Sequence, residues 1–131
     1  MRALIVEDEF LSRKVLRSFL STIFEVDIVV NGKEAVDAFE LAHEEGRPYD
    51  LLLMDIMMPE IDGIEALRRI RELERGRKVT SPAKVIMTTA LDDPKTVIRS
   101  FHDGEASAYI VKPVDKEKLF LELERLNLIH K

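Results

Sequence analysis

Five polar side chains, each standing at the end of a short apolar run, are of the types that phosphoryl transfer requires. Three of them are the carboxylates Glu7, Asp8 and Asp55, while Thr89 supplies a hydroxyl and Lys112 an ammonium group. Carboxylates that meet at one point raise one another's pKa unless a cation holds them together. Oxygen ligands without a nearby His or Cys favour a hard cation, and few protein ligands favour Mg²⁺ over Ca²⁺. The set therefore predicts a Mg²⁺ site at Glu7, Asp8 and Asp55.

The same side chains can be given roles in a reaction at phosphorus. A carboxylate beside Mg²⁺ can attack phosphorus and form an acyl phosphate, which is the role expected of Asp55. Lys112 would offset charge on the phosphoryl oxygens, and the Thr89 hydroxyl would donate to them. Thr88 competes with Thr89, because only one of two successive strand residues faces a given side of a sheet. The small Ala90 would leave room for a donor to approach.

These side chains converge only if the apolar runs before them are strands of one sheet. The runs are rich in Val, Ile and Leu and do not alternate with polar residues, which is typical of parallel strands covered on both faces. Segments with helical spacing separate them, so the pattern predicts five βα units around a parallel sheet. Such open sheets bind ligands at the carboxyl ends of their strands. The predicted strands are Ala3–Val6, Val26–Val30, Leu51–Met54, Val85–Met87 and Ala108–Val111.

Five helices are predicted from apolar residues that recur at three- and four-residue steps. Pro94 suits the first position of the fourth helix, and Asp115 suits the N-cap of the fifth. The polar segment Glu74–Ala83 contains a Gly and a Pro and predicts a surface loop. The residues that mark the helices are Leu11, Val15, Leu16, Phe19, Leu20 and Ile23 in the first, Ala35, Val36, Phe39, Leu41 and Ala42 in the second, Ile64, Leu67, Ile70, Arg71 and Leu73 in the third, Val97, Ile98 and Phe101 in the fourth, and Leu119, Phe120, Leu123 and Leu126 in the fifth.

Length and composition fit one soluble domain. The chain has 131 residues, 46% of them hydrophobic, and its net charge of −5 argues against direct binding of nucleic acid. It has no cysteine, which excludes disulfides and thiolate metal sites and fits a cytoplasmic protein. Glu7, Asp8 and Glu9 interrupt the first apolar run too early for a signal peptide, and no run is long enough to span a membrane.

The motifs at the strand ends resemble those of response regulator receiver domains over essentially the whole chain. The resemblance implies a flavodoxin-like (βα)₅ fold, a doubly wound five-stranded parallel sheet of order 2-1-3-4-5, formed by a single receiver domain over residues 1–131. The matching segments are Glu7-Asp8 after Leu4-Ile5-Val6, then Leu53-Met54-Asp55-Ile56-Met57-Met58-Pro59-Glu60-Ile61-Asp62-Gly63, Thr89-Ala90, and Tyr109-Ile110-Val111-Lys112-Pro113.

The resemblance also implies a role for each residue of the metal site. Asp55 would be the phosphoacceptor and a ligand of Mg²⁺. Asp8 would bind the ion directly, Glu7 would hold it through water, and the backbone carbonyl of Met57 would complete the protein ligands. Glu7 stands where the family often has Asp, and its longer side chain would shift the water network without removing the metal.

A second group of residues would carry the signal. By resemblance, Thr89 and Lys112 would contact the phosphoryl group, so that Thr89 is preferred to Thr88. Tyr109 would be an aromatic switch, turning inward when Thr89 is drawn toward the phosphoryl group. A cis peptide between Lys112 and Pro113 is also implied. The face formed by the fourth helix, fifth strand and fifth helix would then change and inform a partner.

The resemblance further implies partners and excludes turnover. The phosphoryl group would come from a sensor histidine kinase, a phosphotransfer protein or a small acyl phosphate, and the downstream target is a protein that the sequence does not name. A homodimer that forms on phosphorylation is also allowed. The chain would be a phosphoacceptor and not a turnover enzyme. Because it ends soon after the fifth helix, we expect a stand-alone regulator or an excised receiver.

Met57 and Leu91 flank the expected phosphoryl site. Both are apolar and would orient an attacking water poorly, which predicts a long-lived phosphoryl group.

Three other functions compete with phosphoryl acceptance. An FMN-binding electron carrier of the same fold would need a Gly- and hydroxyl-rich loop where Glu7, Asp8 and Glu9 stand. An aspartyl-phosphate phosphatase usually has a second Asp two residues after the nucleophile, where this chain has Met57. A degenerate receiver that only binds proteins remains the main alternative, although no acidic, Thr or Lys position is missing.

Overall fold

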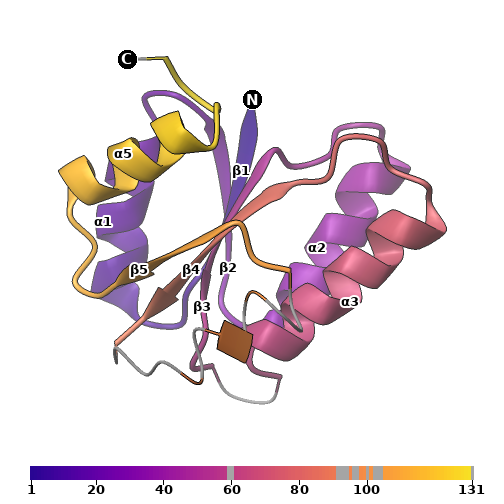
Figure 1. Cartoon of the computed structure of the whole chain (residues 1–131), viewed down its shortest axis with the longest axis horizontal. Helices are drawn as coiled ribbons and strands as arrows, with labels where there is room; N and C mark the ends of the chain where they lie inside the picture. Colours follow the sequence, from indigo (N-terminus) through magenta and orange to yellow (C-terminus); the bar gives the residue numbers. More distant parts are fainter. Residues whose placement is uncertain (59–60, 91–94, 96–97, 100, 102–104, 131) are drawn as a thin grey trace.

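The apolar runs form one parallel sheet, as the sequence predicts. In the computed structural model, which describes residues 1–58, 61–90, 95, 98–99, 101 and 105–130, the strand order is β2-β1-β3-β4-β5 (Figure 1). The chain crosses from β2 past β1 to β3, so β1 and β3 lie side by side and the strand order reverses there. The strands are β1 Arg2–Val6, β2 Glu25–Val29, β3 Leu51–Asp55, β4 Lys84–Thr89 and β5 Ala108–Val111.

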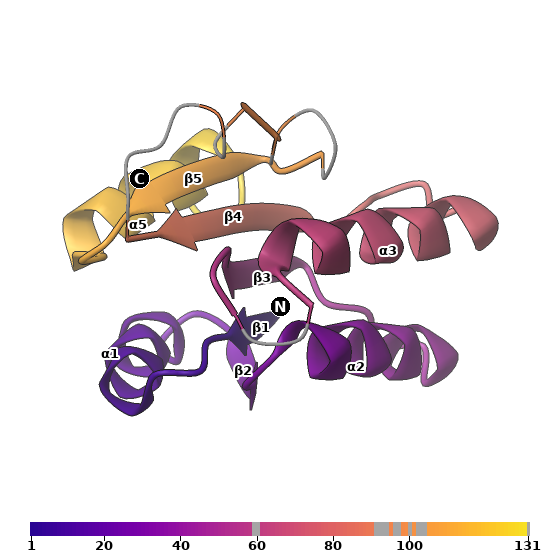
Figure 2. The same cartoon turned by 90° about the horizontal axis from the view of Figure 1, so that it is seen from below.

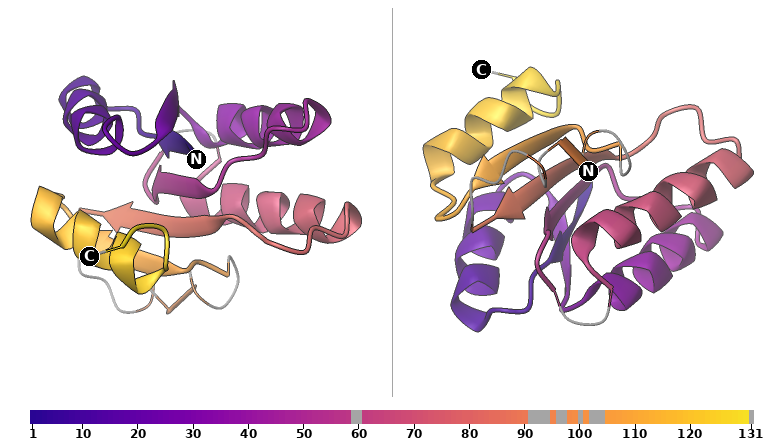
Figure 3. Two further views of the ribbon diagram at one scale, coloured as in Figure 1. Left: turned by 90° about the horizontal axis from the view of Figure 1, so that it is seen from above. Right: turned by 60° about the horizontal axis from the view of Figure 1, so that its bottom comes forward.

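Helices cover both faces of the sheet. In Figures 1 and 2, α1 and α5 lie on one face and α2 and α3 on the other. The pair α2 and α3 runs side by side (Figure 3). The bounds of these helices are α1 Phe10–Leu20, α2 Gly32–Glu44, α3 Gly63–Gly76 and α5 Lys116–Arg125.

Side chains on the two faces of the sheet form two separate cores. Leu4, Leu52 and Val85 point toward α2 and α3, while Ile5 and Leu53 point toward α1 and α5. Both cores are thus built by alternate residues of the same strands. The central strand β3 is buried along its whole length, whereas the edge strand β2 is half-buried. The alternation fixes which polar residues at the strand ends share a face.

An acidic or amide side chain caps each of these four helices. The Glu9 carboxylate accepts hydrogen bonds from the backbone N–H of Leu11 and Ser12, at 3.2 and 2.6 Å. Hydrogen bonding from the Ser12 side chain, together with the two backbone bonds, holds the pKa of Glu9 below its usual value. Glu9 is therefore committed to the start of α1, which leaves Glu7 and Asp8 for the functional site. The other N-caps are Asn31, Asp62 and Asp115.

Parts of the predicted helical pattern are wrong. Leu11, Val15 and Leu41 were expected on packed stripes, but they are 65%, 45% and 53% exposed. The helix α3 continues to Gly76, three residues into the predicted loop Glu74–Ala83. It continues because the Glu74 carboxylate is buried and paired.

A buried ion pair explains that extension of α3. Arg71 lies 2.7 Å from the Glu74 carboxylate and donates to the carbonyl of Ala83, whose N–H donates to Glu74. Arg71 also donates twice to the Glu105 carbonyl, at 3.0 and 3.2 Å. The network satisfies a buried cation and ties α3 to the segments before β4 and β5.

The predicted fourth helix falls mostly outside the described residues, which include only Ile98 and Phe101 of its three marker positions. Within the part of the chain that is described, no helix has the length and apolar character needed to cross a membrane.

Candidate functional site

The strand register places the predicted site residues in one row at the carboxyl edge of the sheet. Val6 pairs with Met54, so Glu7, the next residue along the chain, lies beside Asp55 at the end of β3. Asp55 pairs with Thr88 on β4. Because residues paired in parallel strands point the same way, Glu7, Asp55 and Thr88 all face the α1 and α5 side.

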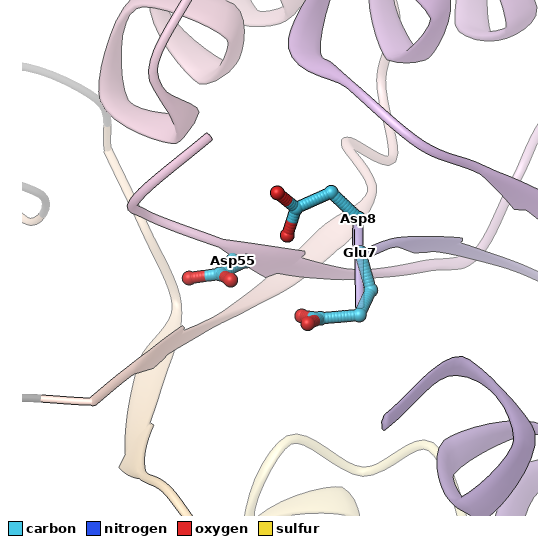
Figure 4. A group of neighbouring side chains, drawn as sticks. All are labelled: Glu7, Asp8 and Asp55. Atoms are coloured by element: carbon cyan, nitrogen blue, oxygen red, sulfur yellow. The ribbon is translucent and has the colours of Figure 1, made fainter. Parts of the chain in front are cut away.

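The three predicted carboxylates come together. One oxygen from each of Glu7, Asp8 and Asp55 lies within 4.8 Å of those of the other two. Figure 4 shows the three side chains as neighbours. Glu7 and Asp55 are buried, with 1% and 6% of their surface exposed, whereas Asp8 is exposed. The cluster is therefore open to solvent on the side of Asp8.

Lys112 links two of these carboxylates directly. Its Nζ lies 2.9 Å from Asp55 Oδ2 and 3.0 Å from each carboxylate oxygen of Glu7. Lys112 follows β5, and its backbone N–H donates to the Thr89 carbonyl at 2.7 Å, which fixes the start of the side chain. The peptide bond from Lys112 to Pro113 is cis, as the resemblance implied.

Burial and the shared ammonium set the protonation of the pair formed by Glu7 and Lys112. Burial raises the pKa of Glu7, the hydrogen bond from Lys112 opposes this rise, and the nearby Asp55 charge adds to it, so that the pKa stays above its usual value. Burial would lower the pKa of Lys112, but the hydrogen bonds to Asp55 and Glu7 outweigh it and raise the pKa. Lys112 therefore stays positively charged at neutral pH.

The backbone around the carboxylates is fixed by bonds that the sequence did not predict. Arg13 on α1 donates to the carbonyls of Glu7 and Asp8, at 3.3 and 2.9 Å. No signal in the sequence distinguishes Arg13 from the other basic residues of α1. Asp55 Oδ1 accepts the N–H of Met57 at 3.1 Å, which shapes the loop after β3. A Cβ at Gly63 would collide with the Asp55 carbonyl, so glycine is required at the start of α3.

Thr88 and Thr89 point to opposite faces of the sheet. Thr88 shares the face of Asp55, and its hydroxyl has no hydrogen-bond partner among the described residues. Thr89 pairs with Val111, and it shares the opposite face with Tyr109, which lies two residues before Val111. Both threonines are buried. The register therefore connects Thr89, rather than Thr88, with the predicted switch residue.

Two other predicted site residues are exposed. Met57, whose carbonyl is the expected fourth ligand, has 67% of its surface exposed, directly beside Asp55. Tyr109 is 37% exposed, so its ring lies outward in this structure. Leu91, predicted to flank the phosphoryl group, lies outside the described residues.

The carboxylate cluster fits a hard divalent cation. Its donors are carboxylate oxygens without His or Cys, and the ligand atoms are close enough to share one ion. Lys112 neutralises part of their charge, which lets Glu7 and Asp55 lie close together. With one exposed carboxylate at the rim, a metal ion would keep several of its waters, as Mg²⁺ does.

Comparison with known proteins identifies the class to which this fold and site belong. The model of the response regulator receiver domain matches residues 3–124. The two-component response regulator ORR41 of Oryza sativa subsp. japonica is 36% identical over 128 residues, covering 98% of this chain and 95% of that protein. The chain belongs to the receiver domain family of two-component response regulators.

Solved structures agree with this assignment. The CheX-CheY-BeF₃-Mg²⁺ complex from Borrelia burgdorferi matches with a TM-score of 0.83 and 29% identity, over 97% of this chain and 89% of that chain. The receiver domain of the histidine kinase CKI1 from Arabidopsis thaliana, complexed with Mg²⁺ and BeF₃⁻, matches with a TM-score of 0.80 and 29% identity, over 98% and 90%. The flavodoxin-like strand order predicted from the sequence is thereby confirmed.

Proposed function

We propose that this receiver accepts a phosphoryl group on Asp55 and signals through a change at its surface. The observation that carries the proposal is the convergence of three carboxylates and one lysine at the carboxyl edge of the sheet. Asp55 is the carboxylate that both the Lys112 ammonium and the Met57 N–H contact. Its position at the end of the central strand β3 holds it rigidly for attack.

When the donor is a phosphohistidine, the proposed reaction transfers a phosphoryl group from an imidazole nitrogen to a carboxylate oxygen of Asp55. An Asp55 carboxylate oxygen forms a bond to phosphorus as the bond from phosphorus to the imidazole nitrogen breaks, and the imidazole leaves with that electron pair and a proton from solvent. A small acyl phosphate would react in the same way, with its carboxylate as the leaving group. Lys112 lies within reach of the oxygens of the transferred group and stabilises their charge.

Mg²⁺ would be held by Asp8, Asp55 and the Met57 carbonyl, with Glu7 bound through water. When bound, the ion offsets negative charge on the carboxylates and the phosphoryl oxygens. The relatives solved with Mg²⁺ and BeF₃⁻, the latter a stand-in for a phosphoryl group, support this part of the proposal.

The surface beside the site suits a protein donor. A cavity of about 440 Å³ opens between α1 and the residues after β5, and Lys112 is part of its wall. Leu11 lines this cavity and is 65% exposed, and the preceding residue in the chain, Phe10, is 64% exposed. A histidine kinase or phosphotransfer protein that reaches Asp55 would cover these apolar side chains, since contiguous exposed apolar residues mark interaction sites. Such a partner would meet the chain in the cytoplasm.

Phosphorylation would be passed on through Thr89 and Tyr109. The phosphoryl group attracts the Thr89 hydroxyl, and Tyr109 turns inward on the same face of the sheet. The face around β5 and α5 then changes for a downstream protein or a second copy of the chain. No turnover of a substrate is involved, and the negative net charge makes nucleic acid an unfavourable direct partner.

Intact-mass measurement tests the proposal. Incubation of the full chain with a small acyl phosphate and Mg²⁺ should add the mass of one phosphoryl group, and EDTA or Asp55→Asn should abolish the gain. Asp62→Asn, at the exposed N-cap of α3, is the matched carboxylate control and should still gain the mass. If the wild-type chain gains nothing from either an acyl phosphate or histidine kinases, the degenerate binding module becomes the better explanation.

A further inference from the structure

Phe101 stands against the outward ring of the proposed switch residue. The ring centroids of Phe101 and Tyr109 are 6.0 Å apart, and the rings meet edge-on at 83°. This is the favoured geometry of an aromatic pair. Phe101 comes from the segment between β4 and β5, so the contact joins that segment to β5.

Tyr109 lies between two competing neighbours. The register places Tyr109 beside Met87 and Val111 beside Thr89, so Tyr109 and Thr89 are diagonal neighbours on one face of the sheet. Phe101 contacts Tyr109 on the outward side. A Tyr109 ring that turned toward Thr89 would lose the edge contact with Phe101.

The two rings form a pair that is half open to solvent. Tyr109 is 37% and Phe101 40% exposed, so neither ring is held by a closed core. The contact between the two rings therefore contributes to the equilibrium between the outward and the inward position of Tyr109.

We propose that Phe101 is a latch that holds Tyr109 outward and thereby sets how readily this receiver switches. The inference rests on the proposed function, since it takes Tyr109 as the switch, but it adds a positioning residue that the resemblance does not supply. An edge-on aromatic contact changes a two-state equilibrium by between about two- and tenfold. Removing the Phe101 ring should therefore raise the ratio of inward to outward Tyr109 by that factor.

The first test needs no phosphoryl group. The chain has two tyrosines, and Tyr49 is buried at 6% exposure, so 3-fluorotyrosine labelling gives one buried reference signal and one signal for Tyr109. The ¹⁹F shift between H₂O and D₂O reports solvent exposure of each ring. Phe101→Ala and Phe101→Leu should decrease this isotope shift for Tyr109, because the ring turns inward. A larger isotope shift for Tyr109 would contradict the inference, because it would mean that the ring stays outward and becomes more exposed once Phe101 no longer covers it.

The second test measures activation. The bound BeF₃⁻ gives its own ¹⁹F signal, which allows titration in the presence of Mg²⁺ without any label on the protein. Phe101→Ala should lower the midpoint about two- to tenfold. Ile98→Ala is the control, since Ile98 belongs to the same segment, is 61% exposed and should leave the midpoint unchanged.

A double substitution separates a latch from a general structural role. In a Tyr109→Leu background, Phe101→Ala should no longer change the BeF₃⁻ midpoint, because the ring that it holds is absent. An equal effect in both backgrounds would overturn the inference. If the wild-type chain binds no BeF₃⁻, the proposed function fails, and the isotope shift of Tyr109 still decides on the latch.

Discussion

Lys112 Nζ lies 2.9 Å from Asp55 Oδ2, and the same atom lies 3.0 Å from both oxygens of Glu7. One ammonium group from the end of β5 thus neutralises carboxylates from the ends of β1 and β3. This contact supplies a counter-charge that lets Glu7 and Asp55 lie side by side. It also places the lysine beside the carboxylate on which we expect phosphorylation.

Lys112→Met should destabilise the metal-free protein by about 1–3 kcal/mol, since it leaves buried acceptors on Glu7 and Asp55 without their donor. Mg²⁺ should restore more stability to this variant than to the wild type, because the ion supplies the missing positive charge. Urea unfolding with and without Mg²⁺ measures both effects. Lys118→Met is the control: Lys118 is 62% exposed in its ion pair with Asp115, and its loss should change stability by less than about 0.5 kcal/mol. Equal destabilisation by the two variants would contradict the role of Lys112.

Mg²⁺ affinity should fall as the pH falls, beginning above the usual range of a glutamate. The reason is that the pKa of Glu7 is raised, so a proton competes with the ion at pH values where an ordinary carboxylate is already ionised. Calorimetric titration with Mg²⁺ at several pH values measures this dependence. Glu7→Gln cannot bind the proton, so its weaker affinity should vary less with pH in that range. A steeper dependence in the variant would contradict the assignment.

Thr89→Val should uncouple phosphorylation from the switch. Asp55 should still gain the phosphoryl mass, while the ¹⁹F signal of Tyr109 should stop responding to Mg²⁺ and BeF₃⁻. Thr88→Val is the matched control, because it removes the neighbouring hydroxyl on the opposite face. That hydroxyl has no partner in the described part of the chain, so its removal should preserve the switch and leave stability equal or slightly higher. Loss of the response in Thr88→Val alone would reverse the assignment.

Met57→Asn should shorten the lifetime of the phosphoryl group. Met57 is 67% exposed beside Asp55, so a polar side chain there can orient an attacking water. One added hydrogen bond of about 1 kcal/mol to that water corresponds to roughly fivefold faster hydrolysis. Phosphate release from the isolated phosphorylated chain gives the rate, with Met58→Leu as a control on the neighbouring residue. An unchanged rate would remove Met57 from the explanation of the lifetime.

The sequence predicted the parts of the site that depend on strand order alone. Asp55 and Lys112 each stand at the end of a clear apolar run, and parallel strands bring their ends to one edge. The Thr89 orientation depends on the register of β3 against β4, which the sequence left open between Thr88 and Thr89 until the family resemblance was used. The structure shows that the two hydroxyls face opposite sides.

Contacts between distant segments could not be predicted. Glu7 reaches Lys112 across 105 positions of the chain, and Arg71 reaches the Glu105 carbonyl across 34. An Arg within an apolar helical stripe looks the same in sequence whether its side chain is buried in an ion pair or exposed to solvent. The same holds for Leu11, whose spacing fits the packed face of α1 although 65% of it is exposed. Helical periodicity predicts the face of the helix on which a side chain lies, but it does not predict which segment, if any, packs against that face.

Chemical mapping of the phosphorylated residue tests the central claim most directly. Borohydride reduces an aspartyl phosphate to homoserine, so peptide mass spectrometry after reduction identifies the acceptor carboxylate. After incubation with Mg²⁺ and an acyl phosphate, homoserine should be found at position 55 and at no other aspartate. Homoserine at position 8 or 62 with Asp55 unchanged, or a phosphoryl group that resists reduction on another type of residue, would contradict the proposed function.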